Sequence, residues 1–470
     1  MFSTKVVALA SAALAAGLAP LPASAKPLPA YPQAEAQTLD LAKQAIALRS
    51  VRGPGNKTGE VAALFRDTLV AGGFDPAEVS ITPYEDTAYL IATWKGSDPA
   101  LKPLVISGHM DVVAANPADW QRDPFTPVVE NGYLFGRGAS DMKFDGALAI
   151  ASLLELKRQG YKPRRSIVIE FSGDEETTMA TSAIIADKLA GAELVLNIDG
   201  GGGTLDDETG LPIKFSWDGA EKIYADYRLT VTNPGGHSSR PGKTNAINQL
   251  AAALVRIGDY RFKPEVNELS RAYFAQTAKL EPDLATSKAM TAFAADPADK
   301  AAIAVLAANP ATVGRIGTTC VATMIEGGHA PNALPQRASA NINCRIFPGH
   351  AREAILAELK QVAAEPALVI EDVTEGSVAT NPSPMRKDFT DALAKALHAV
   401  RPGIPIIPGI ASGASDSMWF RHAGVPSYGA GATFSKSSED FSHGLNERVP
   451  LSNIRPGIAY YLILLRELSR

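Results

Sequence analysis

Cysteine is scarce in this chain: its 470 residues include only Cys320 and Cys344. Two cysteines do not make the disulfide framework of a small secreted domain. They either form one disulfide or stay reduced as a buried pair. Both lie at the same sequence distance from Asn332, so a simple hairpin around that residue would place them opposite each other.

Basic tracts and long apolar runs are also missing beyond the N-terminal region. The 45 basic residues are balanced by 50 acidic ones, with a net charge of −5, so nucleic acid is not an expected partner. No apolar run after the first 25 residues is long enough to cross a bilayer. The hydrophobic content of 46% and the charged content of 20% are typical of a globular protein, and the length predicts two or three domains.

The first 25 residues have the pattern of a secretory signal peptide. A short start containing Lys5 precedes the alanine-rich apolar segment Val6–Ala19, and Ala23-Ser24-Ala25 has the small-x-small pattern of signal peptidase cleavage. An N-terminal membrane anchor is the alternative, but the apolar segment is short for a bilayer span. We therefore expect an exported protein, periplasmic or secreted, whose mature chain begins at Lys26.

Helical and strand patterns alternate along the two outer parts of the chain. The predicted helices are 34–48, 58–71, 144–159 and 181–189, and the predicted strands are 88–94, 104–107, 133–135, 166–171 and 194–198. This alternation predicts an α/β fold with a mostly parallel sheet flanked by helices.

A different order of elements begins near residue 219. Strand, helix, strand, strand, helix and strand patterns follow at 223–231, 246–257, 318–325, 338–346, 351–363 and 367–373. This is the split β-α-β (ferredoxin-like) plan of a small α+β domain, interrupted by an alanine-rich helical stretch at 258–312. The first pattern returns from Pro384. We therefore expect one domain built from 26–218 and 377–470, with a second domain, 219–376, inserted into it.

Five stretches carry acidic residues or histidines at predicted strand ends or turns. They are Gly108–Asp111, Gly136–Lys143, Ser172–Glu176, Asn197–Gly200 and Asp440–Gly444. Open α/β sheets bind ligands outside the carboxyl ends of their strands, so these stretches are candidates for one shared site. Histidine with carboxylate, and no thiolate nearby, suits zinc or a similar divalent cation.

Each stretch also has an ordinary structural explanation when it is taken singly. Asp141 could cap the helix that follows it, and Asp199 could belong to turn chemistry before its glycines. Asp174-Glu175-Glu176 could be a solvated turn, and His443 a loop residue. Together they indicate a metal site, because two cations need about five protein ligands when one carboxylate bridges. The candidate ligands are His109, Asp141, Glu176, Asp199 and His443, which leaves Glu175 available as a general base.

With these motifs the chain resembles the M20 metallopeptidase family, the group of carboxypeptidase G2, aminoacylase-1 and succinyl-diaminopimelate desuccinylase. The resemblance covers nearly all of the expected mature chain and is carried by SGHMDVV, GRGASDMK, SGDEE, NIDGG and EDFSHG. It implies that His109 and Asp199 bind one metal, that Glu176 and His443 bind the other, and that Asp141 bridges them.

The same resemblance implies supporting roles for further residues of the two domains. Asp111 would orient His109, Glu175 would be the general base, and a cis peptide bond would follow Asp141. The inserted domain would be a lid or dimerisation domain. In it, His237 would contact the oxyanion, while Asn332 and Arg345 would bind substrate together with Gly413 of the larger domain. Arg345 suits a carboxylate because its guanidinium makes two parallel hydrogen bonds, although a salt bridge within the lid is the alternative.

These residues predict an exported di-metal hydrolase that cleaves an amide bond next to an amino acid with a free carboxylate. Zinc is the expected metal, with cobalt and manganese as alternatives. The substrate would be a small peptide, cleaved by a carboxypeptidase or dipeptidase, or else an N-acyl amino acid, cleaved by a deacylase. Peptides rank first because an exported enzyme would meet them.

Two other classes of protein fit the sequence less well. A catalytically inactive binding protein would have lost a metal ligand or the base, and none is lost here. A serine hydrolase would need a G-x-S-x-G elbow, which the sequence does not contain. A homodimer is expected, because closed two-fold dimers are the commonest oligomers. In family dimers a partner's lid delivers the histidine that corresponds to His237, although a long lid could supply it within one chain.

Overall fold

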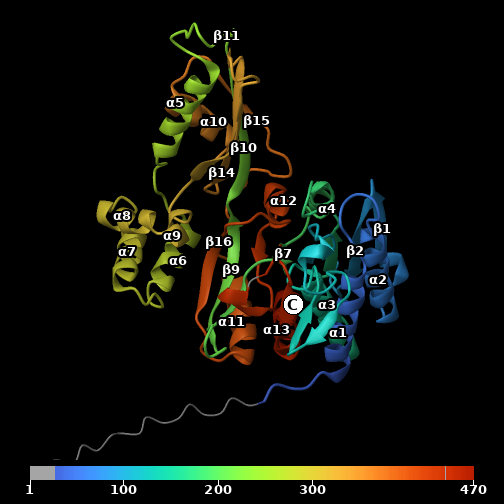
Figure 1. The fold of residues 1–470 in the computed structure, drawn as a ribbon. Coiled ribbons are helices and arrows are strands. Elements are labelled where there is room, and N and C mark those ends of the chain that lie inside the picture. Colours follow the sequence, from blue (N-terminus) through green and yellow to red (C-terminus); the bar gives the residue numbers. More distant parts are fainter. Residues whose placement is uncertain (1–26, 440) are drawn as a thin grey trace, which may run out of the picture.

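The structure is a computed structural model that describes residues 27–439 and 441–470 (Figure 1). The predicted signal peptide, residues 1–25, lies outside the described residues. Two main sheets organise the described chain, and the smaller one stands above the larger in the view of Figure 1.

The larger sheet has ten strands in the order β1-β2-β6-β3-β7-β17-β9-β8-β18, with β16 beside β9. Their bounds are β1 Val79–Tyr84, β2 Thr87–Trp94, β3 Leu104–His109, β6 Ile167–Ser172, β7 Leu194–Asn197, β8 Gly202–Leu205, β9 Pro212–Glu221, β16 Ile406–Ala411, β17 Ser427–Gly429 and β18 Phe434–Lys436. The central strands β6, β3, β7 and β17 are parallel. Antiparallel pairing at β1, β2 and β9 makes the sheet as a whole mixed.

Helices cover both faces of this sheet, as the alternating pattern predicts. They are α1 Pro32–Ala47, α2 Thr58–Ala71, α3 Lys143–Arg158, α4 Ala180–Lys188, α11 Lys387–Val400, α12 Ser417–His422 and α13 Ile454–Leu468. Leu104 and Ile106 of β3 belong to the core that includes α3 and α13, whereas Val105 belongs to the core beneath α4 and α12. Because both faces are buried, the strand is a continuous apolar run.

The inserted domain contains an antiparallel sheet in the order β12-β14-β10-β15, with α5 and α10 packed on it. The bounds are β10 Ile223–Thr232, α5 Ala246–Asp259, β12 Thr319–Gly327, β14 Arg337–Ile346, α10 Arg352–Ala363 and β15 Leu368–Asp372. This is the predicted split β-α-β order. Two small sheets complete the described strands: β11 (Gly236–His237) with β13 (Ala333–Leu334), and β4 (Val128–Glu130) with β5 (Tyr133–Phe135) and β19 (Arg448–Pro450).

Cys320 and Cys344 form a disulfide between β12 and β14. The two residues are direct partners in the strand register, and their Cα atoms are 4.1 Å apart. The predicted register is therefore confirmed, and of the two states open to these cysteines the structure has the bonded one.

The stretch predicted to be helical at 258–312 forms helices α6 Glu268–Thr277, α7 Leu284–Ala295, α8 Lys300–Ala308 and α9 Pro310–Val313. Phe274, Met290 and Phe293 give these helices a small core of their own. Leu269 of α6 joins the main core, and α6 packs against β16 of the larger sheet (Figure 1). The helices therefore lie beside the larger domain and leave the β12 edge of the inserted sheet uncovered.

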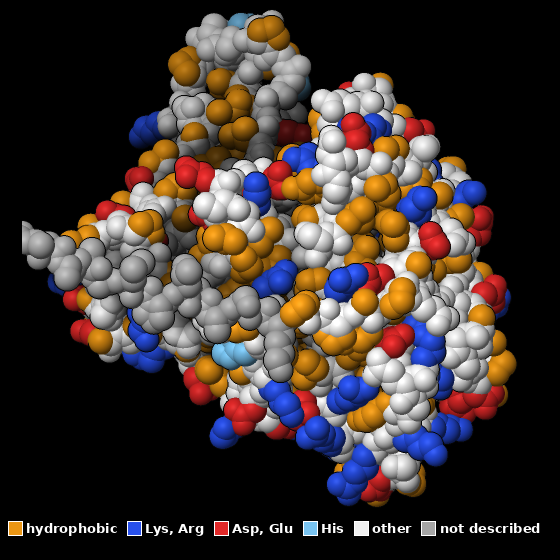
Figure 2. Space-filling view, turned by 90° about the horizontal axis from the view of Figure 1, so that it is seen from below, with side chains coloured by type: hydrophobic (Ala, Val, Ile, Leu, Met, Phe, Trp, Pro, Cys, Tyr) orange, Lys and Arg blue, Asp and Glu red, His pale blue; other side chains and the backbone are white. Residues whose placement is uncertain are grey.

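Charged side chains of both signs are scattered over the face of the molecule seen in Figure 2. Lys and Arg lie among Asp and Glu on this face, as expected from their near balance in the composition. Among the residues that the structure describes, none of the helices combines the length and the apolar character needed to cross a membrane.

Candidate metal centre

The predicted metal ligands come from strand ends and turns that meet at one edge of the larger sheet. His109 is the last residue of β3, Glu176 follows β6, and Asp199 follows β7. These three strands are parallel neighbours, so their carboxyl ends lie together. Asp141 is in the turn before α3, and His443 is in the loop before β19.

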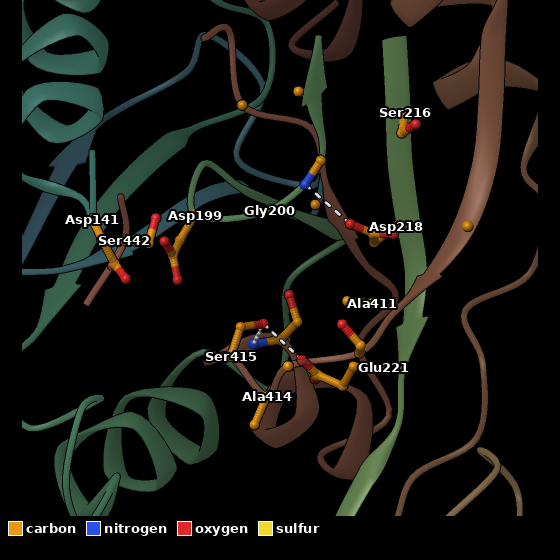
Figure 3. Close-up of a pocket in the computed structure, with 18 of the residues that line it drawn as sticks. Asp141, Asp199, Gly200, Ser216, Asp218, Glu221, Ala411, Ala414, Ser415 and Ser442 are labelled. Atoms are coloured by element: carbon orange, nitrogen blue, oxygen red, sulfur yellow. Dashed lines mark hydrogen bonds between the residues drawn. The ribbon is translucent and has the colours of Figure 1, made fainter. Parts of the chain in front are cut away.

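Asp141 lies between the two histidines. Its Oδ1 is 3.1 Å from Nε2 of His109, and its Oδ2 is 3.1 Å from Nε2 of His443. Glu176 Oε2 is 2.9 Å from the same nitrogen of His443, and Asp199 Oδ2 is 3.7 Å from that of His109. The structure thus brings all five predicted ligands together, and the side chains of Asp141 and Asp199 lie side by side in Figure 3. The peptide bond between Asp141 and Met142 is cis, as predicted.

The electrostatics of this cluster are those of a cation site. Burial raises the pKa of Asp199 and of Glu175 well above the ordinary range of a carboxyl group. Burial disfavours a charged His109, but Asp199 and other carboxylates outweigh it and raise its pKa well above the ordinary value. Hydrogen bonds with Asp141 and Glu176 raise the pKa of His443 to about 10. Buried carboxylates at this density are costly without positive charge, which a bound cation supplies.

Asp111 holds the first histidine and the acidic turn in place. Its backbone carbonyl accepts a hydrogen bond of 3.0 Å from Nδ1 of His109, which leaves Nε2 to face the carboxylates. Its carboxylate is 3.6 Å from Nδ1 and accepts hydrogen bonds from the backbone N–H groups of Glu175 and Glu176, each 3.1 Å long. Asp111 therefore orients His109 chiefly through its backbone, and its side chain fixes the turn that carries the base.

Neighbouring polar groups fix the remaining turns. Asp174 accepts hydrogen bonds from the backbone N–H groups of Ala180 and Thr181, and so ties the acidic turn to the start of α4. Asn197 Oδ1 accepts one of 2.8 Å from the backbone N–H of Asp199. Gly201 has a φ of +69°, and a Cβ there would lie 2.5 Å from the carbonyl oxygen of Gly429. The glycine run after Asp199 therefore lets this loop lie against β17.

A cavity of about 1120 Å³ connects this centre to the inserted domain. Its wall includes Asp141, Glu175, Glu176, Asp199 and His443, together with Arg345 and Gly413. Arg345 Nη1 donates a 3.2 Å hydrogen bond to the carbonyl of Ser412, next to Gly413, and its guanidinium lies 4.9 Å from the ring centroid of Tyr224. No carboxylate partner within 4.0 Å is found for Arg345 among the described residues. On the cavity wall in Figure 3, Ser415 donates a hydrogen bond to Glu221.

His237 and Asn332 lie together, but away from this cavity. Ser238 N–H donates a 3.0 Å hydrogen bond to the carbonyl of Asn332, and His237 pairs with Ala333 across β11 and β13. Both side chains are exposed, and β11 is at the end of the inserted domain far from the larger sheet (Figure 1). Neither residue is part of the described cavity wall.

Other residues at the site could not be found from sequence patterns. Tyr273 of α6 and Arg315, which follows α9, also line the cavity, and the Arg315 guanidinium is 4.6 Å from the ring centroid of Tyr273. Their positions depend on how α6 docks on β16, which an alanine-rich sequence does not reveal. Glu447 and Arg137 lie behind the ligand turns, and the only local signal for them is their nearness in sequence to His443 and Asp141.

Two imidazoles, a carboxylate between them and further carboxylates at the ends of parallel strands are the donor set of a metal-dependent hydrolase. The model of Peptidase family M20/M25/M40 matches residues 105–467, and the chain belongs to this family. It is therefore a hydrolase that acts on amide bonds.

Three similar proteins illustrate the range of the family. The mouse N-fatty-acyl-amino acid synthase/hydrolase PM20D1 is 28% identical over 387 residues, which are 78% of this chain and 74% of that protein. The probable carboxypeptidase S-like 2 of Dictyostelium discoideum is 26% identical over 419 residues, 81% of this chain and 74% of that one. The M20 family metallo-carboxypeptidase Sso-CP2 of Sulfolobus solfataricus has a TM-score of 0.69 at 19% identity, covering 92% of this chain and 98% of its own, and so shows the same fold.

Zinc binding is expected to release protons, because a ligating imidazole must be neutral. With its pKa at about 10, His443 of the metal-free protein carries a proton at about pH 7, and the raised pKa of His109 acts in the same direction. Binding should therefore release at least one proton per chain, and affinity should rise with pH. Titration calorimetry in buffers of different ionisation enthalpy measures this release. A heat of binding that does not depend on the buffer would contradict the assignment of these histidines as ligands.

Proposed function

We propose that the protein is an exported di-metal hydrolase, with zinc as its metal, that cleaves the amide bond next to an amino acid bearing a free carboxylate. Carboxypeptidase or dipeptidase activity is the form we favour. The observation that carries this proposal is that Asp141, between two histidines, opens into the same cavity as Arg345 and Gly413. Metal chemistry and recognition of a carboxylate can therefore act on one small substrate.

The residues present fit two divalent cations. His109, Asp141 and Glu176 offer ligand atoms within 4.8 Å of one another, and Asp199 and His443 extend the group on either side. Asp141 has one oxygen toward each histidine, as a bridging carboxylate requires. When bound, the two cations would polarise the scissile carbonyl and make a water molecule more acidic.

The protein's own groups supply proton transfer and orientation. Glu175 lines the cavity next to the ligands, and hydrogen bonding of its backbone to Asp111 fixes its position. It would take a proton from the attacking water and then give that proton to the nitrogen of the leaving amine. Arg345 would hold the carboxylate of the leaving amino acid, beside the backbone of the loop containing Gly413.

Hydrolysis of N-acyl amino acids is the second candidate. The mouse relative is named as an N-fatty-acyl-amino acid synthase/hydrolase, and the Dictyostelium relative as a probable carboxypeptidase. Glycine, serine and charged residues dominate the described cavity wall, with few large apolar side chains such as Met179 and Ile198. A peptide suits such a wall better than a long alkyl chain, which gains its binding energy by burying apolar surface.

Replacing Glu175 should separate catalysis from metal binding. Glu175→Gln removes the base and leaves the five ligands, so turnover should fall by about 10²–10⁴-fold while the metal content is unchanged. Steady-state kinetics and metal analysis on the same preparation measure both. Glu375→Gln, which changes an exposed carboxylate elsewhere on the cavity wall, is the matched control. Retained turnover, or metal lost in step with turnover, would contradict the role of Glu175.

Replacing Arg345 should affect only substrates that carry a free carboxylate. A charged hydrogen-bonding pair is worth about 1.5–3 kcal/mol, so Arg345→Met should lower kcat/KM for a dipeptide by about 10- to 100-fold. The same dipeptide with an amidated C-terminus should be cleaved poorly by both proteins, with little difference between them. Arg345→Lys should recover part of the loss, because it keeps the charge without the planar fork. An equal loss on both substrates would argue that Arg345 has a structural role.

We also propose that the protein is a homodimer whose partner subunit supplies His237. The edge strand β12 supports this proposal, since Val321, Met324 and Ile325 are 59–64% exposed on it. An exposed apolar edge strand can pair with another chain, and exposed apolar patches mark interaction sites. His237 and Asn332 lie far from the cavity of their own chain, so a second chain is one source of the missing oxyanion contact.

Subunit mixing tests this arrangement directly. His237→Ala and Glu175→Ala chains should each be inactive as homodimers, because each lacks one part of every site. A mixture in which subunits have exchanged should regain activity, since a hybrid dimer holds one complete site. Subunit exchange can be followed by native mass spectrometry of differently tagged chains. Absence of recovery despite exchange would show that each chain completes its own site.

Export remains part of the proposal. The N-terminal pattern favours it, and the disulfide between Cys320 and Cys344 suits an oxidising compartment. N-terminal sequencing of protein recovered from the cell envelope or medium should start at Lys26. Recovery of a chain that starts at Met1 would contradict processing.

A further inference from the structure

Glu447 lies fully buried behind the metal centre, and its carboxylate accepts five hydrogen bonds from one short turn. Oε1 accepts from the backbone N–H groups of Ser140 (2.7 Å) and Asp141 (3.0 Å), and from the Ser140 hydroxyl (3.1 Å). Oε2 accepts from Gly138 N–H (3.1 Å) and from Arg137 Nη1 (2.6 Å). Every donor belongs to residues 137–141, the turn that ends at the proposed bridging ligand.

Arg137 connects this carboxylate to the second ligand loop. Its Nη2 donates a 3.2 Å hydrogen bond to the carbonyl of Gly444, the residue after His443. Its backbone N–H donates to Pro124, and its guanidinium lies 5.1 Å from the ring centroid of Trp120. The Arg137 side chain is 3% exposed and that of Glu447 is 0% exposed, so water does not compete for their bonds.

The two loops held by this pair carry ligands that must meet at a fixed separation. Asp141 has one oxygen toward each histidine, at 3.1 Å in both cases. His443 can reach Asp141 only if residues 443–447 keep their position relative to residues 137–141. Glu447 is itself in the second loop and bonds to the first, so one side chain sets the position of both.

We propose that Glu447, paired with Arg137, is a positioning residue that holds Asp141 and His443 at the spacing two metal ions require. The inference rests on the proposed di-metal function. A carboxylate is needed because all five groups around it are donors. Glutamine at 447 would turn an NH₂ group toward some of these donors and leave them without an acceptor. Residues that orient metal ligands typically contribute about 10- to 100-fold to metal affinity.

The test compares the zinc affinity of Glu447→Gln with that of a matched destabilised variant. Asn453→Ala is the control, because Asn453 is also buried and, within the described part of the chain, its side chain bonds only the backbone of Phe434, at 3.0 Å for both bonds. Competition with a chromogenic chelator gives affinity, thermal melting of the metal-free proteins gives stability, and the visible spectrum of the cobalt-loaded proteins reports ligand geometry.

Glu447→Gln should bind zinc about 10- to 100-fold more weakly than the unaltered protein and should change the cobalt spectrum. Asn453→Ala should melt at a lower temperature yet keep the affinity and the spectrum. Equal affinity in Glu447→Gln, or an equal loss in Asn453→Ala, would overturn the positioning role. If Glu447→Gln does not fold, Arg137→Lys takes its place, with the same two outcomes. Failure of the unaltered protein to bind zinc would instead refute the proposed function.

Discussion

The cluster of predicted metal ligands depends on one carboxylate, that of Asp141, which faces two histidines at once. His109 comes from the end of a buried parallel strand, whereas His443 comes from a loop more than three hundred residues later. Their Nε2 atoms approach opposite oxygens of the same side chain at 3.1 Å. Contacts of this kind are not made by local structure, so the whole larger domain has to fold before the ligands meet.

Burying several carboxylates close together costs free energy, and hydrogen bonds from neighbouring backbone groups hold them in place. Asp111 fixes the turn of Glu175 and Glu176 through two backbone N–H groups, and Glu447 fixes the turn of Asp141 through a larger set. The pKa of Asp199 remains well above the ordinary carboxyl range, because burial disfavours its charge. Divalent cations would relieve this cost, which is why the arrangement of carboxylates is itself an argument for metal binding.

The position of the inserted domain determines what such a centre can act on. Arg345 on β14 meets the loop containing Ser412 and Gly413, so one wall of the cavity belongs to each domain. His237 and Asn332 are at the other end of the inserted sheet and do not meet the metal ligands of their own chain. A centre complete in its ligands but lacking these two residues is the structural reason for proposing a partner subunit.

Much of this could be predicted from the sequence, where local patterns carry the information. The apolar run before His109 predicts a strand buried on both faces, and the strand pattern at 223–231 predicts β10 of the inserted sheet. The equal distance of Cys320 and Cys344 from Asn332 predicts the register that pairs them. The docking of α6 on β16 could not be predicted, because amphipathic helices do not specify which surface they cover.

The residues that support the metal ligands could not be predicted from the sequence either. Glu447 and Arg137 act through contacts between segments about three hundred residues apart. An acidic residue near a histidine motif has no distinctive pattern by itself. The sequence predicts that Asp111 orients His109. Only the folded geometry shows that its backbone carbonyl orients the histidine, while its carboxylate fixes the acidic turn.

The bridging role proposed for Asp141 is tested most directly by the number of zinc ions bound per chain. Purified protein loaded with zinc and freed of excess metal should contain two zinc ions per chain by plasma mass spectrometry, and Asp141→Asn should contain fewer than two because the shared ligand is weakened. Two ions retained with unchanged affinity in Asp141→Asn, or fewer than two in the unaltered protein, would contradict a bridged di-metal centre.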